Sequence, residues 1–331
     1  MTPSQLGKQR NLDAVRTLLR ERRTATCAEL ARLSGLSVVT MGALIRELVA
    51  GGEAVPDGRL PSEGGRPSQV YRFNAGHAHA LALCVLQKHG ETLLLASVAD
   101  LQGTVLSQSQ TRLHGDEAEL LMVFARDACQ KDGLIRSIGV GIPGQAAGGT
   151  VRFCDVASFT GLSLCERLAV QTGCVVTLEN DMNAAVYGYA CRGGPKEDEC
   201  TVGVYFPPDN GPGAGVLTGR ALLGGKGGMA GELGNLPLSV DWLHQREPFE
   251  PVISDCLQAV AAVLSPHRVI LYREGLNLAA LEACMQERWP PVLLKPELVT
   301  DEALLPDYER GVRQLALEKL WPAPQERTNP S

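Results

Sequence analysis

Apolar residues in the first part of the chain follow helical spacing in three successive segments. The first predicted helix spans residues 11–22, with an apolar stripe of Leu12, Val15, Leu18 and Leu19. A short helix from residue 28 carries Leu30, Ala31 and Leu33. A third helix, from residue 38, has the stripe Met41, Leu44, Ile45 and Leu48. Thr26 and Glu29 have the spacing of a capping box, Gly35 allows a tight turn, and Ser37 can cap the third helix, which Gly51 and Gly52 end. Helix, glycine turn and capped helix is the helix-turn-helix pattern.

The next segment, EAVPDGRLPSEGGRPSQVYRF, predicts two short strands around a turn rich in Gly, Pro and Arg, which is a wing. We therefore assign residues 1–75 to a winged helix-turn-helix DNA-binding domain. A generic three-helix bundle or a protein–protein module is the alternative.

From residue 80 onward the pattern changes to strands that alternate with helices. Apolar strands are predicted in LALCVL, ETLLLASVAD, TVLSQS, SIGVGIPG, CVVTLEN and ECTVGVYF, with helices over residues 117–130, 164–172 and 182–191. This order indicates an α/β body with mixed sheets over residues 76–331. The Pro-rich end, about residues 322–331, has a composition typical of disorder.

Charge is unevenly distributed between these two parts. Residues 1–75 hold 11 Lys and Arg against 7 Asp and Glu, a net charge of +4. Because the net charge of the whole chain is −6, residues 76–331 carry a net charge of −10. Such a body is repelled by phosphates, so only the first domain is expected to bind a polyanion, namely double-stranded DNA. Base contacts are expected from the start of the third helix, and phosphate or minor-groove contacts from the wing. The candidates are Ser37, Val38, Thr40, Ala43 and Arg46 on the helix and Arg59, Arg66 and Arg72 in the wing.

The ten cysteines are scattered, without a Cys-x-x-Cys motif, which argues against a cysteine-rich zinc site and for a reducing compartment. No apolar run approaches the 18 residues of a membrane span, and the N-terminus has no apolar signal core. We expect a cytoplasmic protein without a membrane partner.

The stretch LENDMNAA, residues 178–185, reads as the end of a strand followed by the start of a helix. Carboxylates beside an amide suit a hydroxylated ligand, so Glu179, Asn180 and Asp181 are ligand-binding candidates. A helix N-cap is the structural alternative for Asp181. Further on, DNGPGAG holds Gly211, Gly213 and Gly215, a turn whose backbone can approach a phosphate closely.

Together, SIGVGIPG, LENDMNAA and GPGAGVLTGRALLGGKGGMAGELG resemble, in order and spacing, the ROK family of bacterial repressors and sugar kinases. The head, ending in GGRPSQVYRFN, resembles the repressor branch of that family. The resemblance implies a two-lobed actin-like sugar-kinase fold with the ligand between the lobes. It also implies that Asp181 stands at the position of the catalytic base, and that Asn180, Glu232 and Asn235 belong to the sugar site.

Three departures from the family pattern predict that catalysis is lost. CVLQKHGETLL stands where the first phosphate loop should have an Asp and glycines, and Tyr272-Arg273-Glu274 replaces a Gly-Gly pair. Asn235 replaces the zinc-ligating His, and His244 and Cys256 do not complete a four-ligand site. We therefore expect no cofactor, neither ATP with magnesium nor zinc, and no catalytic residue.

The sequence thus predicts a transcriptional regulator of carbohydrate metabolism, a repressor, whose inactive kinase-like body senses a sugar or sugar derivative. Binding to a pseudo-palindromic operator implies a homodimer or homotetramer. Two alternatives stay open: an active sugar kinase with a DNA-binding head, and a ligand-blind regulator whose body only oligomerises.

Overall fold

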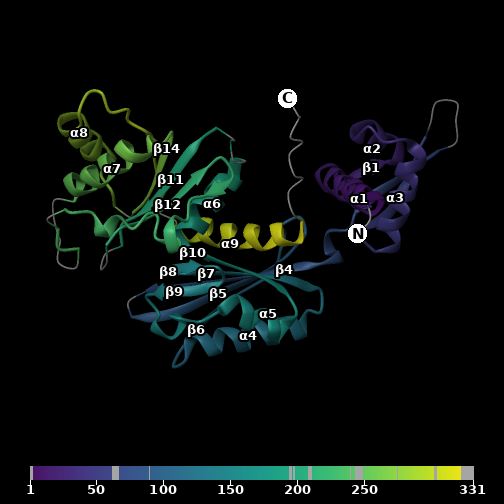
Figure 1. Ribbon diagram of the computed structural model, residues 1–331, viewed down its shortest axis with the longest axis horizontal. Coiled ribbons are helices and arrows are strands. Elements are labelled where there is room, and N and C mark those ends of the chain that lie inside the picture. The colour runs from purple at the N-terminus through teal and green to yellow at the C-terminus, as the bar shows by residue number, and fades with distance from the viewer. Residues whose placement is uncertain are drawn as a thin grey trace.

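The computed structural model describes residues 3–61, 67–88, 90–193, 196, 198–207, 211–238, 240–242, 249–273, 275–301 and 304–321. Two five-stranded sheets form the two lobes of the body, and a smaller head of helices and a three-stranded sheet lies to one side (Figure 1). The predicted α/β body with mixed sheets is confirmed, since parallel and antiparallel pairs occur in both large sheets.

The head consists of α1 (Pro3–Arg22), β1 (Thr24–Thr26), α2 (Cys27–Ser34), α3 (Val38–Ala50), β2 (Ala54–Leu60) and β3 (Ser68–Phe73). The three helices occur where the apolar stripes predicted them, although α1 begins at Pro3 and not at residue 11. The short strand β1, which the sequence pattern did not indicate, pairs with β3 in the sheet order β1-β3-β2.

The starts of α2 and α3 and the turn between them have the predicted capping residues. The backbone N–H of Glu29 donates to Thr26 Oγ1 at 3.2 Å, and Thr26 N–H donates to the Glu29 carboxylate at 2.7 Å. Gly35 ends α2 with φ of 71°, a left-handed conformation that favours glycine, and Ser37 Oγ caps α3. The two helices are bent by 114°, within the range of helix-turn-helix pairs.

No single helix in the described part of the chain has the length and apolar composition needed to cross a membrane. Only α2 and α3 taken together meet that criterion, as a bent pair.

The first lobe runs from η1 (Ala75–His77) through β4 (His79–Lys88), β5 (Glu91–Asp100), β6 (Val105–Leu113), α4 (Glu117–Lys131), β7 (Ile135–Ile142), β8 (Gly144–Ala147), β9 (Thr150–Cys154), η2 (Ala157–Phe159) and α5 (Leu164–Thr172) to β10 (Val175–Asn180). Its sheet has the order β10-β7-β4-β5-β6, and β8 and β9 form a separate hairpin. Helices α4 and α5 cover one face of this sheet (Figure 1).

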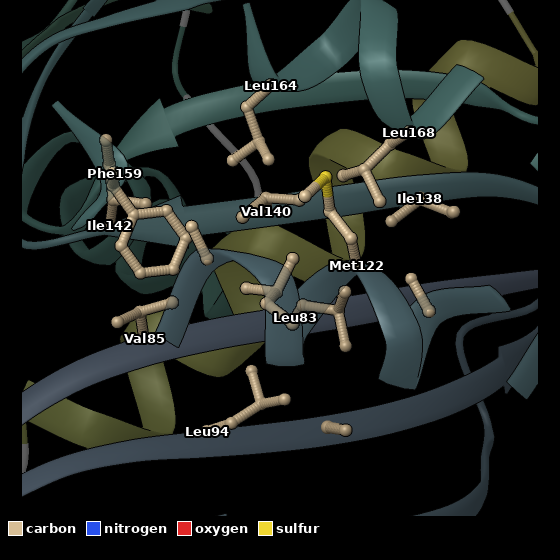
Figure 2. Packing of buried hydrophobic residues seen from close by; sticks show 14 of the residues in the cluster. Leu83, Val85, Leu94, Met122, Ile138, Val140, Ile142, Phe159, Leu164 and Leu168 are labelled. Atoms are coloured by element: carbon tan, nitrogen blue, oxygen red, sulfur yellow. The ribbon is translucent and has the colours of Figure 1, made fainter. Parts of the chain in front are cut away.

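The two faces of strand β7 differ in the size of their side chains. Ile138, Val140 and Ile142 point toward α4 and α5, where they pack with Met122 and Phe159 in a dense apolar core (Figure 2). The residues between them, Gly139 and Gly141, face α9 (Leu304–Leu320) on the other side, and a Cβ on Gly139 would lie 2.6 Å from the Val312 carbonyl oxygen. The two glycines therefore let α9 lie directly on the sheet.

The second lobe contains α6 (Asp181–Gly193), β11 (Cys200–Tyr205), β12 (Gly213–Thr218), β13 (Ala221–Leu222), η3 (Lys226–Gly228), η4 (Leu233–Asn235), α7 (Glu250–Leu264), β14 (Arg268–Tyr272), α8 (Leu278–Arg288) and β15 (Glu297–Asp301). Its sheet order is β13-β12-β11-β14-β15. Alternation again separates the faces: Val269 and Leu271 of β14 pack toward α7 and α8, while Ile270 and Tyr272 pack toward α6 and α9.

Helices α6 and α9 form the layer between the two sheets (Figure 1). They cross at Gly188 and Gly311, where a Cβ on Gly188 would lie 2.7 Å from the backbone nitrogen of Gly311 and still closer to the Asp307 carbonyl oxygen. At one side of the crossing the fully buried Asp307 accepts hydrogen bonds from Arg192, Arg310 and Tyr272, so its charge is paired.

The far end of α9 belongs to the core of the head. Ala316 and Leu317 join the same apolar cluster as Leu12, Val15 and Leu48, and Trp321 packs edge-on against Phe73 with ring centroids 5.9 Å apart. The Arg16 guanidinium lies 5.9 Å from the Trp321 ring and donates to the Glu53 carboxylate at 2.7 Å. The predicted domain boundary at residue 75 is therefore crossed by a shared core. The predicted disorder of residues 322–331 lies outside the described residues.

Candidate functional site

The LENDMNAA segment lies where β10 ends and α6 begins, as its sequence predicted. Asn180 is the last residue of β10, and its Oδ1 accepts hydrogen bonds from the backbone N–H groups of Met182 and Asn183 at 2.9 and 3.0 Å. The cap of α6 is thus formed by Asn180, and the structural alternative considered for Asp181 applies mainly to its neighbour. Asp181 occupies the first turn of the helix.

Asn180 and Glu179 use their side chains to hold this corner together. Asn180 Nδ2 donates to the Gly144 carbonyl oxygen at 2.9 Å and to Asp181 Oδ1 at 3.0 Å. Glu179 Oε1 accepts from the backbone N–H of Asn180 and from Asn183 Nδ2, both at 2.9 Å. With both amide protons and the amide oxygen engaged, Asn180 positions Asp181 in this structure and has little capacity left for a ligand.

Asp181 keeps one carboxylate oxygen available. Its Oδ1 accepts from Asn180 and from the Met182 N–H at 2.8 Å, while no described residue donates to its Oδ2. Burial raises the pKa of Asp181 from 3.8 to about 7, and the negative charges of Asp155 and Glu232 add to the effect. The carboxylates of Asp155 and Glu232 are thus close enough to Asp181 to raise its pKa, and the available oxygen of Asp181 can accept a hydrogen bond from a hydroxyl group.

Glu232 comes from the second lobe, just before η4, and meets the first lobe at a buried amide. Gln145 Nε2 of β8 donates a hydrogen bond to Glu232 Oε1. Asn235, at the end of η4, is exposed. Sequence reasoning missed Gln145 and Asp155, because no motif singles them out; they reach the site through the β8–β9 hairpin.

Two of the three glycines expected to form a phosphate turn lie in a strand. Gly213 and Gly215 lie in strand β12, paired with Tyr205 and Gly203 of β11, and only Gly211 lies before the strand. A Cβ on Gly215 would lie 2.8 Å from the backbone nitrogen of Asn183. Gly215 is therefore needed for the close approach of β12 to the start of α6.

The hairpin that should carry the first phosphate loop is tight. Strands β4 and β5 pair as far as Lys88 and Glu91, so only residues 89 and 90 connect them. His89 lies outside the described residues. At the end of β14, the guanidinium of Arg273 lies 3.8 Å from the centroid of the Phe249 ring.

No group of three or more His, Cys, Asp or Glu side chains within the described ranges could hold a metal ion. His244 lies outside those ranges, and Cys256 is buried in α7. Two cavities of about 220 and 310 Å³ lie away from Asp181, the first beside the end of α6 and the second between head and body.

The DNA-binding candidates in the described part of the head are all exposed. Ser37 and Thr40 hydrogen-bond each other at the start of α3, with 2.9 Å between their hydroxyl oxygens. Val39, absent from the candidates, is 84% exposed beside them. Arg72 lies at the base of the hairpin, 3.7 Å from Asp57, and Arg66 lies outside the described residues.

The two sheets with α6 and α9 between them define an α/β protein with an actin-like, two-lobed body. The ROK family model matches residues 84–270, more than half of the 331 residues. The chain belongs to the ROK family.

Members with different names resemble this chain. The glucokinase of Thermotoga maritima is 33% identical over 145 residues, 42% of each chain. A Caldicellulosiruptor protein named "Putative xylose repressor" is 23% identical over 245 residues, 70% of this chain and 60% of the relative. The chain therefore spans less than two thirds of either relative.

Solved structures show the same fold. A ROK family transcriptional regulator described as a homologue of the E. coli MLC protein has a TM-score of 0.66 at 18% identity, covering 95% of this chain and 98% of its own. The Streptomyces griseus ROK glucokinase, solved with glucose and AMPPNP, has a TM-score of 0.53 at 14% identity, covering 72% and 99%.

The raised pKa of Asp181 predicts a pH-dependent stability. Because the folded chain binds this proton more tightly than the unfolded chain, stability contributed by Asp181 is complete below about pH 4 and is lost as pH rises through about 7. Asp181→Asn should therefore raise the free energy of unfolding at pH 8 by about 2 kcal/mol, allowing for partial solvent access, and by less than half as much at pH 5.

Urea unfolding of both proteins at pH 5 and pH 8 measures this difference. Glu166→Gln, an exposed carboxylate on α5, is the matched control and should leave the two curves unchanged. An Asp181→Asn protein whose stability relative to wild type is the same at both pH values would contradict the assignment.

Proposed function

We propose that this chain is a transcriptional repressor whose winged helix-turn-helix head, residues 1–75, binds double-stranded DNA, and whose body binds a sugar or sugar derivative without phosphorylating it. The head supports the DNA-binding half of the proposal by its geometry. Helix α3 lies on the side of the head that faces away from the lobes (Figure 1), and the residues at its start are exposed. A major groove can accept such a helix, and the exposed Arg59 of β2 is positioned to contact a phosphate; the same role is expected of Arg66, which lies outside the described residues.

The ligand-binding half rests on Asp181 and Glu232. These carboxylates lie where the lobes meet: Asp181 directly follows Asn180, the last residue of the first-lobe strand β10, whereas Glu232 belongs to the second-lobe segment before η4. Both accept hydrogen bonds from hydroxyl groups when ionised. A sugar bound by both joins the lobes, so its binding energy depends on their relative position.

Helix α9 is the observation that carries the proposal. Near its start, the Tyr308 hydroxyl donates to the Val85 carbonyl oxygen at 3.1 Å, and its ring packs on Gly141, one residue before the end of β7. Near its end, Leu317 packs in the core of the head. One helix thus contacts both the sheet edge beside Asp181 and the DNA-binding part. Movement between the lobes can therefore change the position of the head. A ligand that contacts the two lobes differently in the two positions then couples its own binding to the position of the head, as allostery requires.

Loss of catalysis is supported by the tight β4–β5 hairpin and by the residues at the end of β14. A transferred phosphoryl group needs a preorganised cradle, and losing one charge-stabilising group alone costs about 3–4 kcal/mol of transition-state stabilisation. Two identical heads are needed for a pseudo-palindromic operator, so the proposal includes a homodimer or homotetramer.

The proposal is tested with the full-length chain and a panel of hexoses, pentoses, amino sugars and their phosphates. At a concentration about 100 times Kd, a true ligand should add about 2.7 kcal/mol of stability and change DNA affinity measured by fluorescence anisotropy. Asp181→Asn should abolish both responses. The same panel with ATP and magnesium in a coupled assay should show no turnover.

One observation favours the kinase alternative. With its pKa at about 7, Asp181 matches the requirement for a general base at neutral pH. Turnover that disappears in Asp181→Asn would establish the kinase function and overturn the proposal. The internal bonds of Asn180 and the exposed position of Asn235 favour the ligand-blind alternative, which a panel without any stabilising compound would support.

A further inference from the structure

Two cysteines of the first lobe face each other although 45 residues separate them. Cys129 lies in the last turn of α4, and Cys174 lies between Gly173, which ends α5, and the start of β10. Their sulfur atoms are 3.9 Å apart. A disulfide bond requires about 2.05 Å, so the two sulfurs have to approach by about 2 Å. Both residues stand at ends of elements, where a rotamer change or a small backbone shift provides that distance.

The two thiols differ in access and in acidity. Cys174 is only 6% exposed, whereas Cys129 is half-buried and reaches solvent. The thiol hydrogen bond from Cys129 lowers the pKa of Cys174 to about 6, and the Thr172 hydroxyl and the Arg136 charge act in the same direction. Pairing with Cys174 and burial raise the pKa of Cys129. The two thiols therefore titrate as a pair, in which a proton held between the sulfurs favours the formation of one thiolate.

The remaining eight cysteines make no contact of this kind. All ten are free thiols, and no second pair of sulfurs hydrogen-bonds in the described structure. Three of them, Cys84, Cys154 and Cys256, are buried, and burial raises the pKa of each. Partial burial also raises the pKa of four others, namely Cys27, Cys165, Cys191 and Cys200. An oxidant that reaches the folded chain should therefore act selectively on one pair.

We propose that Cys129 and Cys174 form a reversible disulfide when the protein meets a peroxide. Transfer of the shared proton to Cys174 leaves the thiolate on Cys129, which solvent reaches, and this thiolate attacks one peroxide oxygen. An S–O bond forms, the O–O bond breaks, and the departing hydroxide takes the proton from Cys174 and leaves as water. The thiolate of Cys174 then attacks the Cys129 sulfenic acid, so that an S–S bond forms and the S–O bond breaks. The released oxygen takes a proton and leaves as a second water.

The bond would tie the end of α4 to the start of β10. That strand ends at Asn180, which positions Asp181 through the hydrogen bond described above. The cross-link also closes a loop of 45 residues, which stabilises the folded chain relative to the unfolded one. The inference does not depend on the proposed function, because it concerns only the chemistry of the first lobe.

The test uses the full-length chain, treated with a small excess of hydrogen peroxide at pH 7.5, alkylated and digested with trypsin. We expect the peptide Asp127–Lys131 to be joined to Leu168–Arg192, leaving eight of the ten thiols free, and dithiothreitol should release it. Because the longer peptide also contains Cys191, Cys191→Ser is the matched control and should retain the cross-link. Cys129→Ser should lose it.

The rate of oxidation and the identity of the cross-linked cysteines test the proposal further. The pair should react about tenfold faster than Cys165, whose thiol is partly buried and whose pKa burial raises. The thermal midpoint of the oxidised chain should rise and return on reduction. A cross-link that joins two chains, or sulfenic acid that accumulates on Cys129 while Cys174 stays reduced, would overturn the proposal. Loss of other thiols before this pair would do the same.

Discussion

Gly188→Ala is expected to destabilise the protein by about 3 kcal/mol or more, because α6 has no room for a methyl group at this position. At the crossing of α6 and α9, a Cβ on Gly188 would lie 2.7 Å from the backbone nitrogen of Gly311 and closer still to the Asp307 carbonyl oxygen. Backbone atoms cannot move aside as a flexible side chain can, so the helices have to separate. Separation also weakens the buried hydrogen bonds around Asp307.

The same helix supplies the control. Gly193 ends α6, and a Cβ there meets nothing within 4 Å, so Gly193→Ala should change stability by less than about 1 kcal/mol. Chemical denaturation followed by circular dichroism measures both. Equal stability of the two variants would mean that the helices do not cross at Gly188.

Val39→Glu is expected to weaken DNA binding by about 100-fold or more at moderate salt. Val39 is 84% exposed in the first turn of α3, the part of the helix proposed to enter the major groove. A carboxylate at that position is repelled by the phosphates on both sides of the groove. Fluorescence anisotropy on operator and on unrelated DNA measures the loss, which should shrink as salt is raised.

Val170→Glu is the matched control, because Val170 is also 84% exposed on a helix, but in the body. It adds the same charge to the chain and should leave DNA affinity within about twofold of wild type. Equal losses in the two variants would indicate that net charge governs binding, and unchanged affinity in Val39→Glu would remove α3 from the interface.

Local patterns in the sequence were sufficient to predict the helices of the head. The capping residues Thr26, Glu29 and Ser37 act within four residues of where they stand, so their spacing alone indicates where α2 and α3 begin. The start of α1 and the three-residue strand β1 were not predictable in this way. Strand β1 exists because β3 pairs with it, and its own sequence, TAT, is too short to show a period.

The apolar strand IGVGI was predicted correctly, but its alternating glycines indicate more than a strand. They show that one face of β7 must lie against another backbone, and the structure identifies that backbone as α9, some 170 residues further on. Periodicity cannot name a partner at that distance, because the contact depends on how the whole chain folds. For the same reason the sequence did not predict that α9 reaches the head.

The sequence predicted the position of the candidate site better than the role of each residue in it. LENDMNAA does place Asp181 at a strand–helix corner, yet the division of work among its neighbours depends on hydrogen bonds to distant groups such as the Gly144 carbonyl. Asp155 and Gln145 join the site from the β8–β9 hairpin, where no sequence signal distinguishes them. The ligand contacts and the loss of catalysis stay predictions.

The packing of Trp321 and Leu317 against the first seventy-odd residues has a consequence for biosynthesis. A ribosome makes the helices of the DNA-binding part first, and they have to wait until almost the whole chain has emerged before their apolar interior is closed. A nascent chain still attached to the ribosome therefore exposes apolar residues of the head that α9 later covers. In the proposed repressor, the completed head is therefore available to DNA only after α9 has been translated.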